Sequence, residues 1–207
     1  MGDVIVVDVE TTGLDPRSSS IVSIGAVSFA SPEKQFYGEC RPFAGAVIDQ
    51  EAYAVNGFSN AYFEENCVQS LESLLKQFFS WCEGVPGSLF AGQNVGQFDL
   101  AFLVEGAKRC EVSFPESVSR IWTVDLHSVA YTVMVKSGIS PGSALSASRI
   151  YGFVGIPDEP RPHHALRGAL WEAEAFSRLW YGRSLLANFA KYPLPRKYWR
   201  VFPARQA

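Results

Sequence analysis

The chain contains 207 residues, 47% of them hydrophobic, which is enough for one compact domain with a substantial core. Its net charge is −3, and no stretch of 18 residues is uninterruptedly apolar, which argues against a membrane-spanning protein. The amino terminus begins with a strand pattern rather than with a charged region and a leader, so we expect a cytoplasmic protein that makes no membrane contact.

Hydrophobic patterning predicts an alternating α/β chain without internal repeats. Apolar runs predict strands over residues 4–7, 21–29, 35–40, 88–91 and 121–124. Apolar positions at spacings of three and four predict helices over residues 68–82, 99–110, 126–135, 144–151 and 164–181. Alternation of the two patterns after residue 60 indicates a mixed sheet covered by helices.

The four cysteines are widely spaced, and they form no Cys-x-x-Cys pair and have no adjacent histidine. This spacing indicates neither a zinc site nor a disulfide framework. We expect Cys40, Cys67, Cys82 and Cys110 to be reduced thiols in the core or on the surface.

Two carboxylates stand two residues apart where the first strand ends. Because side chains alternate between the two faces of a strand, Asp8 and Glu10 share a face, with Cα atoms about 6.6 Å apart. One divalent cation could touch both, and ligands that are all oxygen favour Mg²⁺ or Mn²⁺ over zinc. The spacing alone also fits an ordinary strand end whose acids are solvated or cap the next turn.

A second acid follows the fourth predicted strand. Residues 92–98 leave the strand through a glycine-bearing loop and deliver Asp99 to the first turn of a helix, with Phe98 expected to pack inward. An aspartate in this place is often only a helix cap, worth about 1 kcal/mol. Asp15 and Asp125 are expected to be turn or capping acids, and His127 a structural or surface histidine.

The carboxyl-terminal part differs in charge from the rest of the chain. Glu174 is the last acid, and seven of the 18 basic residues lie in residues 175–207, which leaves 11 basic against 21 acidic residues before them. Aromatic residues alternate with the basic ones over residues 191–200, a composition that suits single-stranded nucleic acid but also fits a tail that packs its aromatics on the body. We expect residues 183–207 to be an extension packed on or near a domain of residues 1–182.

Three sequence blocks occur in one order along the chain. They are Asp8-Val9-Glu10-Thr11-Thr12-Gly13-Leu14, then Asn94 with Phe98-Asp99-Leu100, then His163-His164-Ala165-Leu166. Together they resemble the DEDDh (DnaQ-like) family of 3′-to-5′ exonucleases, over nearly the whole chain. The resemblance implies a ribonuclease-H-like α/β fold, with a five-stranded mixed sheet, an antiparallel second strand and helices on both faces.

The resemblance also implies a chemistry. Family members hydrolyse phosphodiester bonds with two divalent ions, Mg²⁺ or Mn²⁺, about 4 Å apart. In that pattern Asp8 would bridge both ions, Glu10 would complete the shell of the first, and Asp99 would hold the second, directly or through water. His163 would be the general base, since an imidazole exchanges protons near neutral pH.

Residues that contact substrate are implied in the same way. Thr11 and Thr12 would meet the terminal 3′ hydroxyl, and Leu14 would wedge against the terminal base. The implied substrate-binding set also includes Gly13, Asn94 and Phe98. The expected partner is single-stranded DNA or RNA, or the 3′ end of a duplex, bound without sequence preference through stacking and backbone contacts. A homodimer or a larger replication, repair or RNA-processing complex stays open.

One position departs from the family pattern. The family has an aspartate five residues after the histidine, where this chain has Gly168; counting from His164 gives Ala169. Three interpretations follow. Water fills the vacant ligand position of an active enzyme; or Glu172, one turn further along the helix, replaces the aspartate; or the chain is an impaired module that binds nucleic acid or a partner. The sequence does not separate them.

Overall fold

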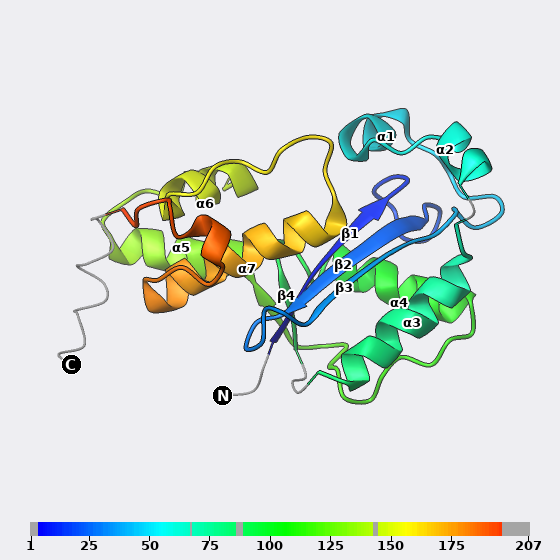
Figure 1. The fold of residues 1–207 in the computed structure, drawn as a ribbon, viewed down its shortest axis with the longest axis horizontal. Helices are drawn as coiled ribbons and strands as arrows, with labels where there is room; N and C mark the ends of the chain where they lie inside the picture. Colours follow the sequence, from blue (N-terminus) through cyan, green and yellow to red (C-terminus); the bar gives the residue numbers. More distant parts are fainter. Residues whose placement is uncertain (1–3, 67, 86–88, 143–144, 196–207) are drawn as a thin grey trace.

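The computed structural model describes residues 4–66, 68–85, 89–142 and 145–195, and within them five strands form one sheet in the order β3-β2-β1-β4-β5 (Figure 1). The strands are β1 (Val4–Thr11), β2 (Ile21–Ser28), β3 (Gln35–Glu39), β4 (Leu89–Gly92) and β5 (Thr123–Asp125). β2 runs antiparallel to β1 and β3, whereas β4 runs parallel to β1 and β5. The expected five-stranded mixed sheet with an antiparallel second strand is confirmed.

Helices cover both faces of this sheet (Figure 1). They are α1 (Gln50–Asn56), α2 (Asn60–Glu65), α3 (Leu71–Glu83), α4 (Asp99–Arg109), α5 (Leu126–Lys136), α6 (Ala147–Val154) and α7 (Ala165–Tyr181). In the described part of the chain, no helix is long and apolar enough to cross a membrane.

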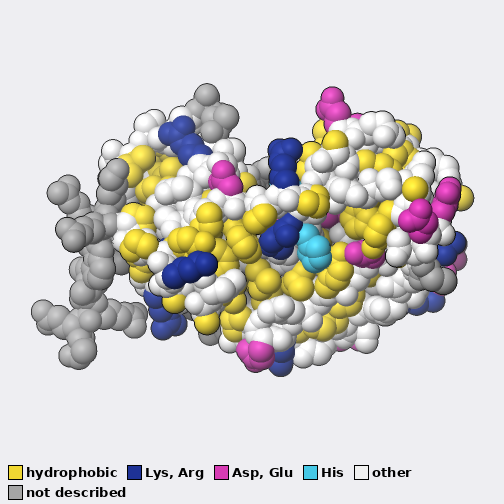
Figure 2. All heavy atoms as spheres, turned by 45° about the horizontal axis from the view of Figure 1, so that its top comes forward, with side chains coloured by type: hydrophobic (Ala, Val, Ile, Leu, Met, Phe, Trp, Pro, Cys, Tyr) yellow, Lys and Arg dark blue, Asp and Glu magenta, His cyan; other side chains and the backbone are white. Residues whose placement is uncertain are grey.

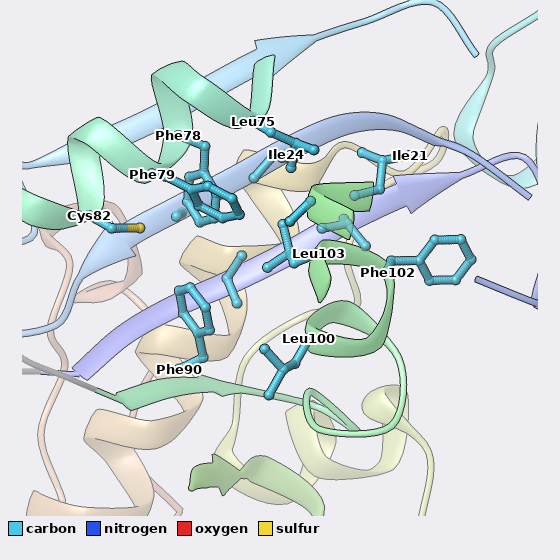
Figure 3. Close-up of a cluster of buried hydrophobic side chains, with 14 of the residues drawn as sticks. Ile21, Ile24, Leu75, Phe78, Phe79, Cys82, Phe90, Leu100, Phe102 and Leu103 are labelled. Atoms are coloured by element: carbon cyan, nitrogen blue, oxygen red, sulfur yellow. The ribbon is translucent and has the colours of Figure 1, made fainter. Parts of the chain in front are cut away.

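The alternation of side chains along β1 divides the core in two. Ile5, Val7 and Val9 face α3 and α4, where they join the apolar cluster drawn in Figure 3. Val6 faces the other way and packs with α5, α6 and α7. Asp8 and Glu10 continue the even-numbered face, so the strand period directs both carboxylates toward the α7 side of the sheet.

The start of α7 lies directly against β2 because Gly25 has no side chain. A Cβ atom at Gly25 would lie only 2.0 Å from the backbone nitrogen of Leu166. No other residue type would permit this approach without moving the helix. The close contact brings the segment from His163 to Gly168 beside the strand that carries the first two acids.

Two parts of the sequence-based assignment were wrong. Helices α1 and α2, which lie at the carboxyl end of β1 in Figure 1, were not predicted. The strand predicted at residues 121–124 begins two residues later, and Ile121 and Trp122 are exposed. The predicted starts of the fourth strand at Ser88 and of a helix at Ala144 lie outside the described residues.

The first part of the carboxyl-terminal segment packs on the body. Phe189 is buried and contacts Trp171 edge to face, with ring centroids 4.6 Å apart. Arg178 donates hydrogen bonds to the carbonyl oxygens of Phe189 and Tyr192. Residues 196–207, which hold four of the seven basic residues, lie outside the described residues, so the contact with nucleic acid stays a prediction.

Among the cysteines, Cys40 and Cys82 are buried free thiols and Cys110 is a half-buried one, as expected. Cys67 lies outside the described residues.

Candidate active site

Three of the predicted acids meet at the carboxyl end of β1. Asp8 and Glu10 come from the strand itself, and Asp99 comes from the first turn of α4. The Oδ1 atom of Asp99 accepts a hydrogen bond from the backbone nitrogen of Val9, between the other two acids, at 3.0 Å. Asp99 and Glu10 are buried, and Asp8 is partly exposed.

The electrostatics of this group favour protonated carboxyls. Desolvation raises the pKa of Asp8 well above its usual range, and the charges of Glu10 and Glu172 raise it further. Burial raises the pKa of Glu10 to about 7, with Arg167 opposing the shift. Burial also raises the pKa of Asp99 to about 8, although the hydrogen bond from Val9 favours its charged form. A cation that entered this group would reverse these shifts.

Helix α7 places Gly168, where the family has an aspartate, and Glu172 close to the group of acids. A Cβ atom at Gly168 would lie 2.0 Å from the Oδ2 atom of Asp8. One turn later, the Oε1 atom of Glu172 accepts a hydrogen bond from the backbone nitrogen of Gln93 at 3.2 Å. The Oε2 atom of Glu172 is buried and has no hydrogen-bond partner among the described residues.

The chemistry of these donors fits a hard divalent cation, because all of them are carboxylate oxygens. In the described part of the chain, no three side chains of His, Cys, Asp or Glu already surround one ion position. The carboxylates would therefore have to rotate toward an ion. On the α7 side of this group, Oε2 of Glu172 is a carboxylate oxygen without a hydrogen-bond partner among the described residues.

His163 lies just before α7, the helix that packs against β1, but its side chain lines a different part of the molecule from the three acids. The backbone nitrogen of His163 donates to the carbonyl oxygen of Val55 at 2.9 Å. Its side chain lines a cavity of about 200 Å³ that Tyr37 and Arg167 also line. No contact recorded among the described residues joins His163 to Asp8. The neighbouring His164 stacks on Tyr37, with ring centroids 4.2 Å apart.

The turn after β1 uses its two threonines differently. Thr12 is buried, and its hydroxyl donates to the carbonyl oxygen of Val47 and accepts from the backbone nitrogen of Ser20. Thr11 donates its hydroxyl to the carbonyl oxygen of Gly13 at 2.7 Å. Leu14 at the tip is 79% exposed. Thr12 therefore holds the turn together, while the side chain of Leu14 is exposed to solvent.

The loop before Asp99 positions the other two expected substrate residues. Asn94 is exposed and has a positive φ of 56°, which turns the chain after β4. Its carbonyl oxygen accepts from the backbone nitrogen of Phe98 at 2.9 Å. Phe98 is half-buried against Phe102, as the expected inward packing requires.

Sequence patterns missed one acid near this group. Glu159 lies in the loop before α7, and its Oε1 atom accepts from the backbone nitrogen of His164 and from Nε of Arg167, both at 3.2 Å. Its charge contributes to the raised pKa of Glu10. No motif marks this position, because the loop is defined only by its prolines.

An exposed apolar pair was also missed. Ile121 and Trp122 are 81% and 72% exposed just before β5. The next residue, Thr123, adjoins the loop that delivers Asp99, since a Cβ atom at Gly96 would lie 3.2 Å from Oγ1 of Thr123.

Two expected capping acids have that role. Asp15 accepts from the backbone nitrogen of Arg17 and from the hydroxyl of Ser18. Asp125 accepts from the backbone nitrogen of Ser128 at the start of α5. Both predictions are confirmed.

Comparison with known proteins agrees with this geometry. The model of the family described as Exonuclease (RNase_T) matches residues 5–174. The chain belongs to this exonuclease family. Among its relatives, Ribonuclease T of Yersinia pseudotuberculosis is 25% identical over 189 residues, which cover 84% of this chain and 83% of the relative. Ribonuclease T of Pectobacterium atrosepticum is 22% identical over 163 residues, 71% of this chain and 73% of the relative.

Solved structures of Exonuclease I share the fold of this exonuclease-family chain. One has a TM-score of 0.69 at 17% identity and covers 88% of this chain. Another is the zinc-bound form of the Escherichia coli enzyme in complex with single-stranded DNA, with a TM-score of 0.67 at 15% identity, again over 88% of this chain. The chain spans only 41% and 42% of these two structures, so it matches one part of Exonuclease I.

Proposed function

We propose that this chain removes nucleotides from the 3′ end of single-stranded nucleic acid by hydrolysing phosphodiester bonds with divalent cations, Mg²⁺ or Mn²⁺. The observation that carries the proposal is the group of Asp8, Glu10 and Asp99 at the end of β1, where burial raises the pKa of each carboxyl and neighbouring acids, Glu159 in the case of Glu10, raise it further. Such an arrangement is costly in the absence of a cation and is typical of functional sites. Membership in the exonuclease family supports nuclease activity.

Bound divalent cations would supply an activated water and stabilise the negative charge on the leaving oxygen. Asp8, Glu10 and Asp99 would hold them through carboxylate oxygens. Asp99 is fixed for this task by its hydrogen bond from Val9. Arg167 lies close enough to Glu10 to lower its pKa, and it is itself bound to Glu159. That pair limits how much positive charge Arg167 contributes to the group.

His163 is the proposed general base. Its backbone is fixed to Val55 and its side chain lines the cavity beside Tyr37, so taking a proton from a water near Asp8 requires the ring to turn toward the acids. Catalytic hydrogen bonds are often incomplete before substrate binds. Substrate binding would therefore complete this part of the site.

Exposed apolar side chains beside the acids support binding of unpaired bases. Leu14 lies in the turn after β1, and Trp122 lies next to the loop that precedes Asp99. Bases stack on such side chains without sequence preference. On the face drawn in Figure 2, Lys and Arg side chains are scattered among apolar ones and form no continuous band. Stacking and metal contacts, rather than a broad basic surface, would then dominate recognition there.

Two nucleic acids are candidates. The sequence relatives are named Ribonuclease T, whereas the solved neighbours include Exonuclease I with single-stranded DNA. A panel of 5′-labelled single-stranded DNA, single-stranded RNA and duplexes with a 3′ overhang, each with Mg²⁺ or Mn²⁺, separates them. A metal-dependent ladder that shortens from the 3′ end supports the proposal. The ladder should vanish with EDTA and in Asp8→Asn.

The control in this assay is Glu83→Gln, which removes an exposed carboxylate at the end of α3. It should leave the rate unchanged. Immediate release of a labelled mononucleotide would indicate the opposite direction of attack. Absence of any metal-dependent shortening, with binding retained, would favour a second function, a nucleic-acid-binding module without catalysis. Gly168 is the observation that favours this alternative. Assembly into a homodimer or a larger complex stays a prediction, which light scattering measures.

A further inference from the structure

The space that a side chain at position 168 would need is already occupied. The Oδ2 atom of Asp8 lies 2.0 Å, and its Cγ atom 2.9 Å, from the place where a Cβ atom would stand. Neither Ala nor Asp fits there unless Asp8 moves. At Gly168, α7 thus lies in close contact with the carboxylate of Asp8, and the contact leaves no space for a water molecule.

Glu172 reaches the same region from one helical turn further along. It is 8% exposed, and its carboxylate lies over the end of β4, where a Cβ atom at Gly92 would lie 3.1 Å from Oε2. Two glycines, Gly92 and Gly168, therefore border the carboxylates of Glu172 and Asp8. The missing side chain at Gly92 leaves room for the carboxylate of Glu172, and the missing side chain at Gly168 leaves room for that of Asp8.

The two oxygens of Glu172 have different surroundings. Oε1 accepts from the backbone nitrogen of Gln93, whereas Oε2 is buried without a partner among the described residues. A buried carboxylate oxygen without a hydrogen bond is costly, and native proteins rarely keep one without a reason. The nearby carboxylates of Asp8 and Asp99 repel that of Glu172. A bound cation would relieve this repulsion and give Oε2 of Glu172 a partner.

We propose that Glu172 supplies the fourth carboxylate of the metal centre, in place of the aspartate that the family has at the position of Gly168. The inference rests on the proposed function, because it adds a ligand to the same centre. Oε2 would face the ion while Gln93 holds Oε1. Glu172 lies one helical turn further along α7 than position 168, and its side chain is longer than that of an aspartate. It would therefore replace the carboxylate that is missing at Gly168.

The test is a calorimetric titration of Mn²⁺ into the wild-type chain, Glu172→Gln and Asp8→Asn, together with thermal unfolding in EDTA. The glutamine keeps the shape and the acceptor for Gln93 but removes the charge. We expect Glu172→Gln to lose Mn²⁺ affinity by at least about tenfold or to lose one binding event. We also expect it to unfold at a higher temperature than the wild type in EDTA at pH 8, because the amide is neutral without binding a proton and does not repel Asp8 and Asp99. A purely structural role predicts the opposite shift.

Two further variants keep the outcome clear. Glu172→Asp keeps the charge but shortens the side chain, so it should also weaken Mn²⁺ binding, and Glu83→Gln should leave the titration unchanged. Unchanged Mn²⁺ binding in Glu172→Gln, with loss in Asp8→Asn, overturns this inference and leaves the proposed function intact. A lower unfolding temperature of Glu172→Gln in EDTA also overturns it. Absence of Mn²⁺ binding in the wild type contradicts the proposed function itself.

Discussion

Two buried glutamates on α7, only two residues apart, have opposite environments. Glu174 forms an ion pair with Nε of Arg178 at 2.6 Å and accepts from the hydroxyl of Ser184 and the backbone nitrogens of Leu185 and Leu186. Among the described residues, Glu172 accepts one hydrogen bond, from the backbone nitrogen of Gln93, and its buried Oε2 atom accepts none. The fold neutralises one carboxylate within the protein and leaves the other unsatisfied.

The two environments indicate a structural role for Glu174 and a functional role for Glu172. Glu174 and Arg178 tie the segment after α7 to the body, since Arg178 also bonds the carbonyl oxygens of Phe189 and Tyr192. Glu172 stands with Asp8, Glu10 and Asp99, where each carboxyl has a raised pKa. A protein of this size can keep such a group only at a cost in stability, which a ligand offsets when it binds.

The largest effect is expected when the buried ion pair between Glu174 and Arg178 is broken. Arg178→Met leaves Glu174 as a buried charge without its partner and should lower the free energy of unfolding by about 3–5 kcal/mol, measured by urea denaturation. The control is Lys76→Met, which breaks an exposed pair with Glu72 of the same spacing and should cost less than about 1 kcal/mol. A similar small loss in both variants would contradict the structural role of Glu174.

The next effect concerns the close contact at Gly168. Replacing glycine by alanine in a helix normally stabilises it by about 1 kcal/mol. Here the new Cβ atom displaces Asp8, so Gly168→Ala should lower both kcat and Mn²⁺ affinity by about tenfold. Gly152→Ala in α6 is the matched control, because a Cβ atom there meets nothing within 4 Å. Equal kcat and equal Mn²⁺ affinity in the two variants would show that the close contact at Gly168 does not affect activity.

Measuring the free energy of unfolding as a function of pH tests the group of acids that contains Glu10. The pKa of Glu10 is about 7 in the fold, against 4.5 for an ordinary glutamate. Between these values the folded state holds a proton that the unfolded state has lost, so stability falls as pH rises. In EDTA, the wild type should lose about 1.2 kcal/mol more than Glu10→Gln between pH 5.5 and 6.5. Parallel curves for the two proteins would show that Glu10 does not titrate in this way. Saturating Mn²⁺ should flatten the difference.

The smallest effect lies outside the acidic group. Trp122→Ala should weaken binding of a single-stranded oligonucleotide by about 1 kcal/mol, roughly fivefold, measured by fluorescence anisotropy with Ca²⁺ in place of the active metal. Tyr131→Ala, an exposed aromatic residue on α5, is the control and should have no effect. If the two variants bind equally well, Trp122 is not a stacking platform.

Much of the fold could be predicted from the sequence, because β1, α3 and α7 carry strong hydrophobic periods. Helices α1 and α2 were missed for a physical reason. In α2 no residue is buried, and in α1 only Tyr53 and Asn56 are, so these helices have no apolar stripe. Their starts depend on the side-chain caps Asp49 and Ser59.

The candidate site was predictable only in part. The spacing of Asp8 and Glu10 and the place of Asp99 at a helix start follow from local rules. Three features do not: the contact between Gly168 and Asp8, the free oxygen of Glu172, and the bonds of Glu159 to the segment before α7. Each joins segments far apart in the sequence or depends on how a loop folds back. Such features are set by tertiary packing, which hydrophobic period and residue spacing do not encode.

The most direct test of the central claim is whether the acidic group binds a divalent cation in solution. Calorimetric titration of Mn²⁺ into the wild-type chain at pH 8, with Asp8→Asn beside it, measures this. We expect saturable binding in the wild type, a rise in the unfolding temperature on binding, and loss of both in Asp8→Asn. Equal binding in the two proteins, or none in the wild type, would contradict it.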